Sequence, residues 1–414
     1  MRWCWGFNWR LIYEKGEFLA LDLGGTNFRV LSGKLDGKRN AVVSAVSKFA
    51  IPIENMQGTG VQLFDFIVDC IDVFLTENKI ERSNVHDLAF TFSFPVEQTG
   101  IAAGKLIVWT KGFSARGVQG QDVVELLNQA LKRRRIHCIN VTVLANDTVG
   151  TLVARSYADP ACDMGVIMGT GTNACYREKL SNIPKLGGLN PDGHMIVNDG
   201  RMIVNMEWGN FNKVRLTRYD KQVDEASVNP GAMYLEKMVS GMYLGEITRL
   251  MIRDLMARKR IFIRNSHGDA LFKAKGSLKT GDMSRIEGDQ TEHLDEMESF
   301  FENIGISNIS FFDKSVLKRL CRMVSTRAAR LGAGAIAAVI SWMDPKLNRK
   351  HTVAVDGSLF EKYPGFGGQI SDTLKELYGE RAEKITLVHS RDGSGKGAAI
   401  MAAVAASAAE PLKN

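Results

Sequence analysis

Two glycine-rich turns in the sequence offer backbone N–H groups that could hold phosphate. Asp22-Leu23-Gly24-Gly25-Thr26-Asn27 follows one apolar run, and Met168-Gly169-Thr170-Gly171-Thr172-Asn173 follows another. Glycine has no side chain to block the approach of a phosphate oxygen, and the exposed N–H groups of such a turn attract anions. Either turn alone is more often a tight hairpin without a ligand. The pair, with the Asp22 carboxylate beside the first turn, favours a nucleotide site.

An acidic residue, Asp147, stands where a predicted strand (140–144) passes into a predicted helix (148–157). Asn146, Asp147 and Thr148 are all favoured helix caps, so a structural role would explain them by itself. A carboxylate at this point could instead accept the proton of an attacking hydroxyl group. A sugar would need further fixed polar groups, and several stand near predicted strand ends: Ser93, Thr110, Lys111, Asn173, Glu207 and Glu236.

Two common nucleotide motifs are absent from the sequence. The segment Gly393-Ser394-Gly395-Lys396-Gly397 is not a Walker A loop, because Ser390 stands in place of the first glycine and Gly397 in place of the required Ser or Thr. No GxGxxG pattern opens a helix after the first predicted strand, which disfavours a Rossmann dinucleotide site. Phosphate binding is therefore predicted at the two glycine turns.

The elements that must position these residues form an α/β pattern. Apolar runs that end at Gly or Pro predict strands, and longer apolar-periodic runs predict helices. Strands followed by helices indicate mixed sheets. The predicted strands are 18–23, 28–32, 88–94, 140–144, 164–168, 174–176, 351–355 and 385–389, and the predicted helices of the second half are 232–258, 314–343, 371–378 and 397–409.

The chain has 414 residues and a formal net charge of +7. This length exceeds what one hydrophobic core usually carries, so two lobes are expected. The only basic run, 132–135, ends a predicted amphipathic helix (122–131), where cations favour the helix dipole. Neither aromatic interleaving nor zinc-finger spacing supports nucleic-acid binding.

Cysteine usage and hydropathy point to a reduced, water-exposed environment. The six cysteines are scattered without a CxxC pair, which is typical of a cytoplasmic protein. The most apolar stretch, 331–343, is too short for a membrane span and is predicted to be a buried helix. The N-terminus lacks the apolar core and small-residue cleavage site of a signal peptide.

Eight segments, taken in order, resemble the hexokinase family. FLALDLGGTNFRVL (18–31) is similar to its first phosphate segment, and LAFTFSFPVEQTGIAAGKLIVWTKGF (88–113) to its sugar-binding segment. VLANDTVGTLVA (143–154) resembles the catalytic-aspartate segment, and GVIMGTGTNACYRE (165–178) the second phosphate segment. VNMEWGNF, EKMVSGMYLGEITRL, VAVDGSL and DGSGKGAA follow in the family's order.

The resemblance implies a two-lobed actin-like ATPase fold of the ribonuclease H-like type, with a cleft between the lobes. The small domain would comprise 17–145 and 392–409, and the large domain 146–391. Residues 1–16 do not resemble the family and look like a truncated N-terminus. The implied activity is ATP-dependent phosphorylation of glucose or a related hexose at the 6-hydroxyl, the first step of glycolysis, in the cytoplasm. No nucleic-acid partner or membrane span is expected, and association with mitochondria stays open.

The same resemblance assigns roles residue by residue. Asp147 would be the general base, and Lys111 would stabilise the transferring charge. Magnesium would travel on ATP, with Asp22 reaching it through water and no direct protein ligand. The sugar would be held by Ser93, Phe94, Thr110, Lys111, Asn146, Asp147, Asn173, Glu207 and Glu236. The nucleotide would be held by Asp22, Gly24, Gly25, Thr26, Asn27, Arg29, Gly169, Thr170, Gly171, Thr172, Gly241, Asp356, Gly357, Ser358 and Ser394.

The sequence departs from the family at two positions that lie just before matched segments. Met233 stands where the family has a sugar-contacting Gln, and a thioether is a weak acceptor and no donor. Arg391 replaces an acidic residue on the nucleotide side. Met233 and the short N-terminus motivate a second hypothesis, a non-catalytic sugar- or nucleotide-binding regulator. A third, an actin- or chaperone-like ATPase, is disfavoured by the sugar-binding segment.

Overall fold

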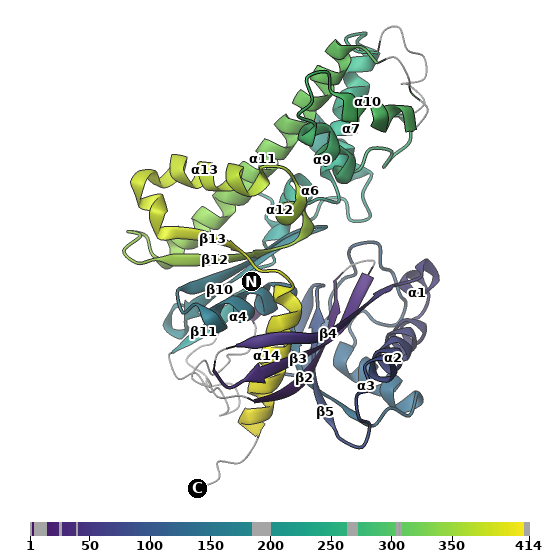
Figure 1. Cartoon of the computed structure of the whole chain (residues 1–414), viewed down its shortest axis with the longest axis vertical. Helices are drawn as coiled ribbons and strands as arrows, with labels where there is room; N and C mark the ends of the chain where they lie inside the picture. The colour runs from purple at the N-terminus through teal and green to yellow at the C-terminus, as the bar shows by residue number, and fades with distance from the viewer. Residues whose placement is uncertain are drawn as a thin grey trace.

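The structure, a computed structural model, describes residues 2–3, 15–24, 27–38, 40–183, 200–262, 272–303, 306 and 309–409. In this part of the chain, two mixed β-sheets lie in separate halves of an elongated molecule, and helices cover their faces (Figure 1). The α/β class predicted from the sequence is confirmed. The domain boundaries drawn at residues 145 and 391 stay predictions.

The five-stranded sheet has the order β4-β3-β2-β5-β8. β2, β3 and β4 are antiparallel, whereas β5 and β8 continue the sheet from β2 in parallel. The hairpin between β2 and β3 carries the first glycine turn. The strands are β2 (Lys15–Leu23), β3 (Asn27–Asp36), β4 (Ala41–Ala50), β5 (His86–Phe92) and β8 (Ile139–Ala145).

The six-stranded sheet has the order β1-β11-β10-β9-β12-β13. β9 and β10 form the second hairpin with a glycine turn, and β12 and β13 are parallel to β9. A separate hairpin joins β6 (Val96–Gly100) to β7 (Ala103–Leu106). The six strands are β1 (Arg2–Trp3), β9 (Cys162–Met168), β10 (Thr172–Lys179), β11 (Arg201–Asn205), β12 (His351–Asp356) and β13 (Ile385–His389).

Helices flank both sheets, and most lie in the second half of the chain. The five-stranded half contains α1 (Ile53–Gln57), α2 (Gly60–Glu77) and α3 (Val123–Arg133). The remaining α-helices are α4 (Asp147–Ala158), α5 (Arg218–Glu225), α6 (Tyr234–Val239), α7 (Leu244–Ala257), α9 (Thr280–Gly288), α10 (Asp295–Asn303), α11 (Phe311–Met343), α12 (Ser358–Lys362), α13 (Phe366–Tyr378) and α14 (Gly393–Ala409). Short 3-10 helices are η1 (Leu180–Asn182), η4 (Trp208–Asn210) and η5 (Gly379–Lys384).

Alternation along the strands of the five-stranded sheet builds two cores. Leu19, Leu21 and Phe90 pack with α2 and α3, whereas Ala20 and Ala89 pack with α14 on the opposite face. This follows from the period of two in a strand, which points successive side chains to opposite faces. Both faces are therefore buried, as the apolar composition of β2 and β5 requires.

The basic run predicted to end a helix does so, and part of it is paired. α3 ends at Arg133, and the Asp122 side chain caps its start by accepting from the N–H groups of Val124 and Glu125. Arg133 binds Asp65 of α2 at 2.6 Å, and Arg134 binds Asp69 at 2.7 Å. These exposed charges serve the packing of two helices.

The two halves meet where α4 and α14 pack against each other. α4 lies on the six-stranded sheet and α14 on the five-stranded sheet, so the helices lie back to back between the sheets (Figure 1). Their shared core is rich in alanine. The buried stretch 398–403 of α14 alone contains four alanines. Small side chains let the helix backbones approach closely. At the crossing, a Cβ atom on Gly397 would lie 1.8 Å from the carbonyl oxygen of Gly150.

The predicted helices of the second half differ from the observed ones in their bounds; α11 begins three residues and α13 five residues earlier than predicted. The predicted helix 232–258 is broken into α6 and α7, because the Gly241 N–H leaves the helix ladder and donates to the Gly169 carbonyl at 2.8 Å. The predicted helix 397–409 begins four residues earlier, as α14 starts at Gly393. Ser394 therefore lies in the first helical turn and not in a loop.

The predicted buried helix 331–343 is the last part of α11, which has 33 residues. By length and composition alone, α11 could cross a membrane. More than half of its most apolar window is buried within the protein, where α11 packs against α7, α9 and α13. We therefore describe it as the central helix of a packed core, and the absence of a membrane span stays a prediction.

The crossing of α4 and α14 yields a stability prediction. Gly397→Ala would force a methyl group onto the Gly150 carbonyl, and overpacking of this kind costs about 1–3 kcal/mol. Gly334→Ala is the matched control, because Gly334 is exposed in the middle of α11 with no atom near its added Cβ. There the exchange should stabilise by about 0.5–1 kcal/mol. Urea unfolding followed by circular dichroism measures both, and equal shifts of the two variants would contradict the prediction.

Candidate active site

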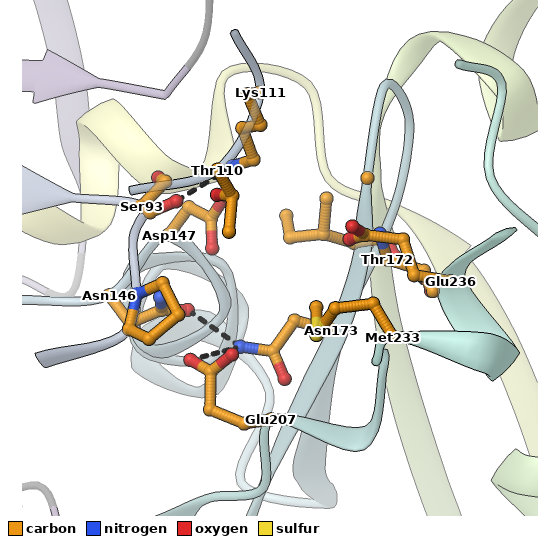
Figure 2. A pocket seen from close by; sticks show the side chains of 13 residues that line it. Ser93, Thr110, Lys111, Asn146, Asp147, Thr172, Asn173, Glu207, Met233 and Glu236 are labelled. Carbon is orange, nitrogen blue, oxygen red and sulfur yellow. Dashed lines mark hydrogen bonds between the residues drawn. The ribbon is translucent and has the colours of Figure 1, made fainter. Parts of the chain in front are cut away.

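Polar side chains from both halves of the molecule line one pocket (Figure 2). Asn146 and Asp147 reach it from the junction of β8 and α4, and Glu207 from the end of β11. Pockets outside the carboxyl ends of parallel strands are common ligand sites in α/β folds. The lining residues are Ser93, Pro95, Thr110, Lys111, Asn146, Asp147, Ile167, Gly171, Thr172, Asn173, Glu207, Met233 and Glu236.

The structure thus brings together all but one of the residues assigned to sugar binding. The exception is Phe94, whose ring is buried behind the wall and packs against Trp109 and Phe113. The Lys111 ammonium lies 5.4 Å from the centre of the Phe94 ring. Phe94 therefore supports the wall of the pocket and does not line it, because its side chain points to the buried side of the chain after β5.

Three of the lining residues have a left-handed backbone. Lys111, Glu207 and Met233 have φ angles of 56°, 53° and 56°. Non-glycine residues rarely adopt this conformation, which costs on the order of 1–3 kcal/mol each and is concentrated at functional sites. In each case the conformation turns a long side chain towards the pocket, as Figure 2 shows.

The carboxyl group of Asp147 lies at the N-terminus of α4, inside the pocket. Its Oδ1 accepts from the Thr148 N–H at 2.9 Å. Burial raises the pKa of Asp147 above its usual range, against the opposing charge of Lys111, and the Asp22 carboxylate raises it further. Lys111 itself donates from Nζ to the Ser93 carbonyl at 2.7 Å. A carboxyl group whose pKa is shifted towards neutrality is suited to proton transfer.

Amide groups fill the floor of the pocket. Asn173 donates from Nδ2 to Asn146 Oδ1 at 3.3 Å and to Glu207 Oε1 at 3.2 Å. Asn146 also caps α4 by accepting from the Thr148 N–H at 3.0 Å, so the helix-cap interpretation of this residue is confirmed. Asn205 joins the group and donates to Glu207 Oε1 at 3.0 Å. Fixed amides and carboxylates of this kind can hold sugar hydroxyls.

The remaining wall belongs to Glu236 and the second glycine turn. The Thr172 N–H donates to Glu236 Oε2 at 3.2 Å, and Trp208 donates from Nε1 to Thr172 Oγ1 at 3.0 Å. Burial raises the pKa of Glu236, and the nearby Lys111 charge opposes the rise. A Cβ on Gly171 would lie 2.7 Å from the Glu236 carboxylate and 3.5 Å from Lys111 Cε. Only glycine therefore fits where the two walls approach.

The pocket is small in this structure. Its free volume of about 40 Å³ leaves room for a few water molecules at most. A six-carbon sugar can therefore enter only if the two walls move apart. Such opening and closing is a common property of sites between two lobes.

Arg29 anchors the nucleotide side assigned from the sequence. It forms ion pairs with Asp22 and Asp392, and it donates from Nη2 to Ser394 Oγ at 2.7 Å. Ser394 in turn donates to Asp22 Oδ2 at 2.7 Å. Burial would lower the pKa of Arg29, but the carboxylates outweigh burial and raise it. Burial raises the pKa of Asp356, and the charge of the nearby Arg29 opposes this rise.

The second glycine turn packs against two other assigned glycines. Gly241 donates to the Gly169 carbonyl at 2.8 Å, and the Met242 N–H donates to Thr170 at 3.2 Å. Gly357 has a φ of 116°, and a Cβ there would lie 2.5 Å from the Met168 carbonyl. These contacts leave no space for side chains and form a backbone surface of the kind that holds phosphate.

Ser358 begins α12, directly after this surface. The first glycine turn is described only in part. Gly24 lies beside Ser93, since a Cβ on it would be 3.4 Å from Ser93 Oγ, and Asn27 begins β3. Gly25 and Thr26 lie outside the described residues. The roles assigned to all these residues stay predictions.

Sequence reasoning missed three residues of the site. Asn205 and Trp208 lie within the VNMEWGNF segment, and Asp392 opens DGSGKGAA. The sequence offered one indication of these residues: each lies in a segment that already contained assigned site residues. What singles them out is contact: Asn205 with Glu207, Trp208 with Thr172, and Asp392 with Arg29.

Comparison with known proteins identifies the family. Two family models, both described as Hexokinase, match residues 12–157 and 163–404. Hexokinase HKDC1 of Mus musculus is 42% identical over 410 residues, which cover 97% of this chain and 43% of that protein. Hexokinase-1 of Homo sapiens is 43% identical over 401 residues, which cover 94% of this chain and 42% of that protein. The chain therefore spans less than half the length of these relatives.

Solved structures agree with the sequence comparison. The hexokinase from Schistosoma mansoni complexed with glucose is similar with a TM-score of 0.84 at 37% identity, over 96% of this chain and 88% of that one. A second structure described as hexokinase has a TM-score of 0.76 at 30% identity, over 98% and 88%. The two-lobed actin-like ATPase fold expected from the resemblance is thus confirmed. On the family models and these structural likenesses together, the chain belongs to the hexokinase family.

Proposed function

We propose that this chain transfers the terminal phosphoryl group of MgATP to the 6-hydroxyl of glucose or a related hexose. One observation carries the proposal: the Asp147 carboxyl, with a raised pKa, lines a polar pocket whose wall also contains Gly171 and Thr172 of the second glycine turn. The structure of the Schistosoma mansoni relative contains glucose, as its description says. We further propose that the reaction occurs in the cytoplasm, as the entry of hexose into glycolysis.

Asp147 acts as the general base in the proposed mechanism. Its carboxylate accepts the proton of the sugar hydroxyl as that oxygen attacks the terminal phosphorus, and the bond from phosphorus to the ADP oxygen breaks. Lys111, whose charge already acts on Asp147, stabilises the negative charge on the transferring group. Asn146, Asn173, Glu207 and Glu236 hold the other hydroxyls, so that the attacking oxygen is aligned.

The phosphates occupy the glycine surfaces in this proposal. The backbone N–H groups of Thr170 and Gly171 face them. The N–H groups of Gly169 and Thr172 already donate to the Gly171 carbonyl and to Glu236. Arg29 supplies positive charge from the other side. Magnesium is part of the substrate, bound to the phosphate oxygens, and Asp22 reaches it through water. Closure of the walls around the sugar excludes water, which limits transfer of the phosphoryl group to water.

A second candidate function is favoured by Met233. Its thioether lines a pocket whose other groups are largely polar, and its Cε lies beside Gly209. A site that binds sugar more weakly could belong to a sugar-binding protein that has no catalytic turnover. The intact Asp147, Lys111 and glycine turns favour catalysis, and turnover measurements separate the two functions.

Replacement of Asp147 tests the base. Asp147→Asn and Asp147→Ala should lower glucose-dependent ADP release by about 10²–10⁴-fold, because no group remains to accept the proton. Glucose binding by Asp147→Asn, measured by calorimetry, should persist. Asp372→Asn is the control, since Asp372 is 73% exposed in α13. A folded wild-type chain that releases no ADP even at high glucose would refute the enzymatic proposal.

The raised pKa of Asp147 predicts the acid limb of the pH–rate profile. The base works as a carboxylate, so kcat/KM should fall as the pH drops through a value above the ordinary aspartate range. Lys111 lowers this pKa, so Lys111→Met should move the limb to higher pH as well as slow the reaction. Lys375→Met, on the exposed side of α13, should leave the profile unchanged. A limb that stays in place in Lys111→Met would contradict the electrostatic argument.

Restoring a polar group at Met233 should strengthen sugar binding. Met233→Gln places an amide in the pocket, and a buried hydrogen bond of this kind is worth about 1–3 kcal/mol, or roughly 5- to 150-fold in glucose affinity. Calorimetry with glucose alone measures the change. Met323→Gln, on the exposed face of α11, is the matched control and should have no effect. Unchanged affinity in Met233→Gln would show that the residue does not face the sugar.

A further inference from the structure

Asn205 is a buried polar residue at the end of β11, directly below the pocket. Its side chain is 7% exposed and does not line the pocket surface. It nevertheless contacts two residues that do. Oδ1 accepts from Asn173 Nδ2 at 2.9 Å, and Nδ2 donates to Glu207 Oε1 at 3.0 Å.

The hydrogen bonds around Asn205 allow only one orientation of its amide. If the amide were turned over, its NH2 group would face the NH2 group of Asn173, and its oxygen would face the Glu207 carboxylate. Both contacts would be repulsive. The Thr148 hydroxyl lies 3.5 Å from Oδ1, but it gives its single proton to Asn146 at 2.7 Å and so does not decide the orientation. The Asn205 amide therefore accepts a hydrogen bond from Asn173 on one side and donates one to Glu207 on the other.

This orientation links two segments that carry sugar-facing groups. Asn173 is on β10, and Glu207 follows β11. Glu207 is also held in the left-handed conformation described above, so its backbone does not by itself favour the observed direction of the side chain. An interaction at the carboxylate is needed to keep it there.

We propose that Asn205 is a positioning residue for sugar recognition, which holds Asn173 and Glu207 in the geometry that binds the hydroxyls. The inference rests on the proposed function, because it names a determinant of the same site. Asn205 touches neither sugar nor nucleotide in this arrangement. Its replacement should therefore change sugar affinity and sugar selectivity, while the KM for ATP stays the same.

Two variants separate positioning from simple loss of stability. Asn205→Ala removes both hydrogen bonds, and the KM for glucose should rise about tenfold or more with a smaller change in kcat. Asn205→Asp keeps the shape and the acceptor towards Asn173 but sets a second carboxylate against Glu207. Above neutral pH this repulsion should make Asn205→Asp weaker in glucose binding than Asn205→Ala. Ile203→Val, two residues away on the same face of β11, is the control for stability alone.

Selectivity among sugars is a measurement that a general loss of protein stability would not change. Monodeoxy glucoses that each lack one ring hydroxyl are compared with glucose in wild type and variants. If Asn205 positions Asn173 and Glu207, the variants lose discrimination at the hydroxyls which these two residues hold, and keep it at the others. A purely structural defect would weaken all the sugars equally, as we expect for Ile203→Val if it has any effect.

Glucose binding by calorimetry and ADP release are measured on the same samples. Wild-type turnover with unchanged glucose affinity and selectivity in both Asn205 variants would overturn the inference alone. Wild type that binds glucose but does not turn over would refute the enzymatic proposal, and the affinities would still decide the inference. Wild type that binds none of these sugars would overturn both.

Discussion

The contact between α4 and α14 is the constraint on which the site depends. The two helices cross with glycine against glycine, at Gly150 and Gly397, so their backbones touch without intervening side chains. Asp147 stands one turn before the crossing on α4, and Ser394 one turn before it on α14. Ser394 holds Asp22 and Arg29. The distance between the proposed base and the proposed phosphate-binding groups is therefore set by backbone contact, which deforms far less than a contact between long side chains.

A second constraint acts on both walls of the pocket. Lys111, Glu207 and Met233 reach the pocket from left-handed backbone positions, which the surrounding structure must hold against their own preference. The aromatic group of Phe92, Phe94, Trp109 and Phe113 packs behind Lys111, and the amide network lies behind Glu207. Rigid packing on one side and hydrogen bonding on the other thus replace the regular secondary structure that the chain lacks at these points.

Much of the fold could be predicted from local sequence, and the failures have a common cause. β13 was predicted with its observed bounds, and the strands that lead into both glycine turns were predicted with their observed ends, because apolar runs with sharp breakers are local features. The two strands that follow the turns are longer than predicted. The helix predicted over 232–258 is broken by a hydrogen bond to Gly169, more than sixty residues away in the chain. The edge strand β4 was missed since one of its faces is exposed and the other is only half-buried.

The same holds for the candidate site: features visible in the local sequence were predicted, and features that depend on contacts between distant segments were missed. Residue types and order identified nearly all of the pocket's polar groups, because a sugar-binding role depends on chemistry that the sequence displays. Asn205 escaped notice, since an asparagine at the end of a strand is ordinary until β10 and β11 are seen side by side. Phe94 was assigned to the sugar through the family resemblance, although its ring is buried against Trp109 and Phe113.

The tryptophans of the two walls give the protein optical probes at useful places. Trp109 is packed behind the wall that carries Thr110 and Lys111, and Trp208 is bonded to Thr172 on the opposite wall. Both are largely shielded from water. Indole emission depends on polarity and on nearby charges, so each ring reports on the movement of its own wall. In variants that keep only one of these two among the six tryptophans of the chain, the separation and approach of the walls can thus be followed by fluorescence, one wall at a time.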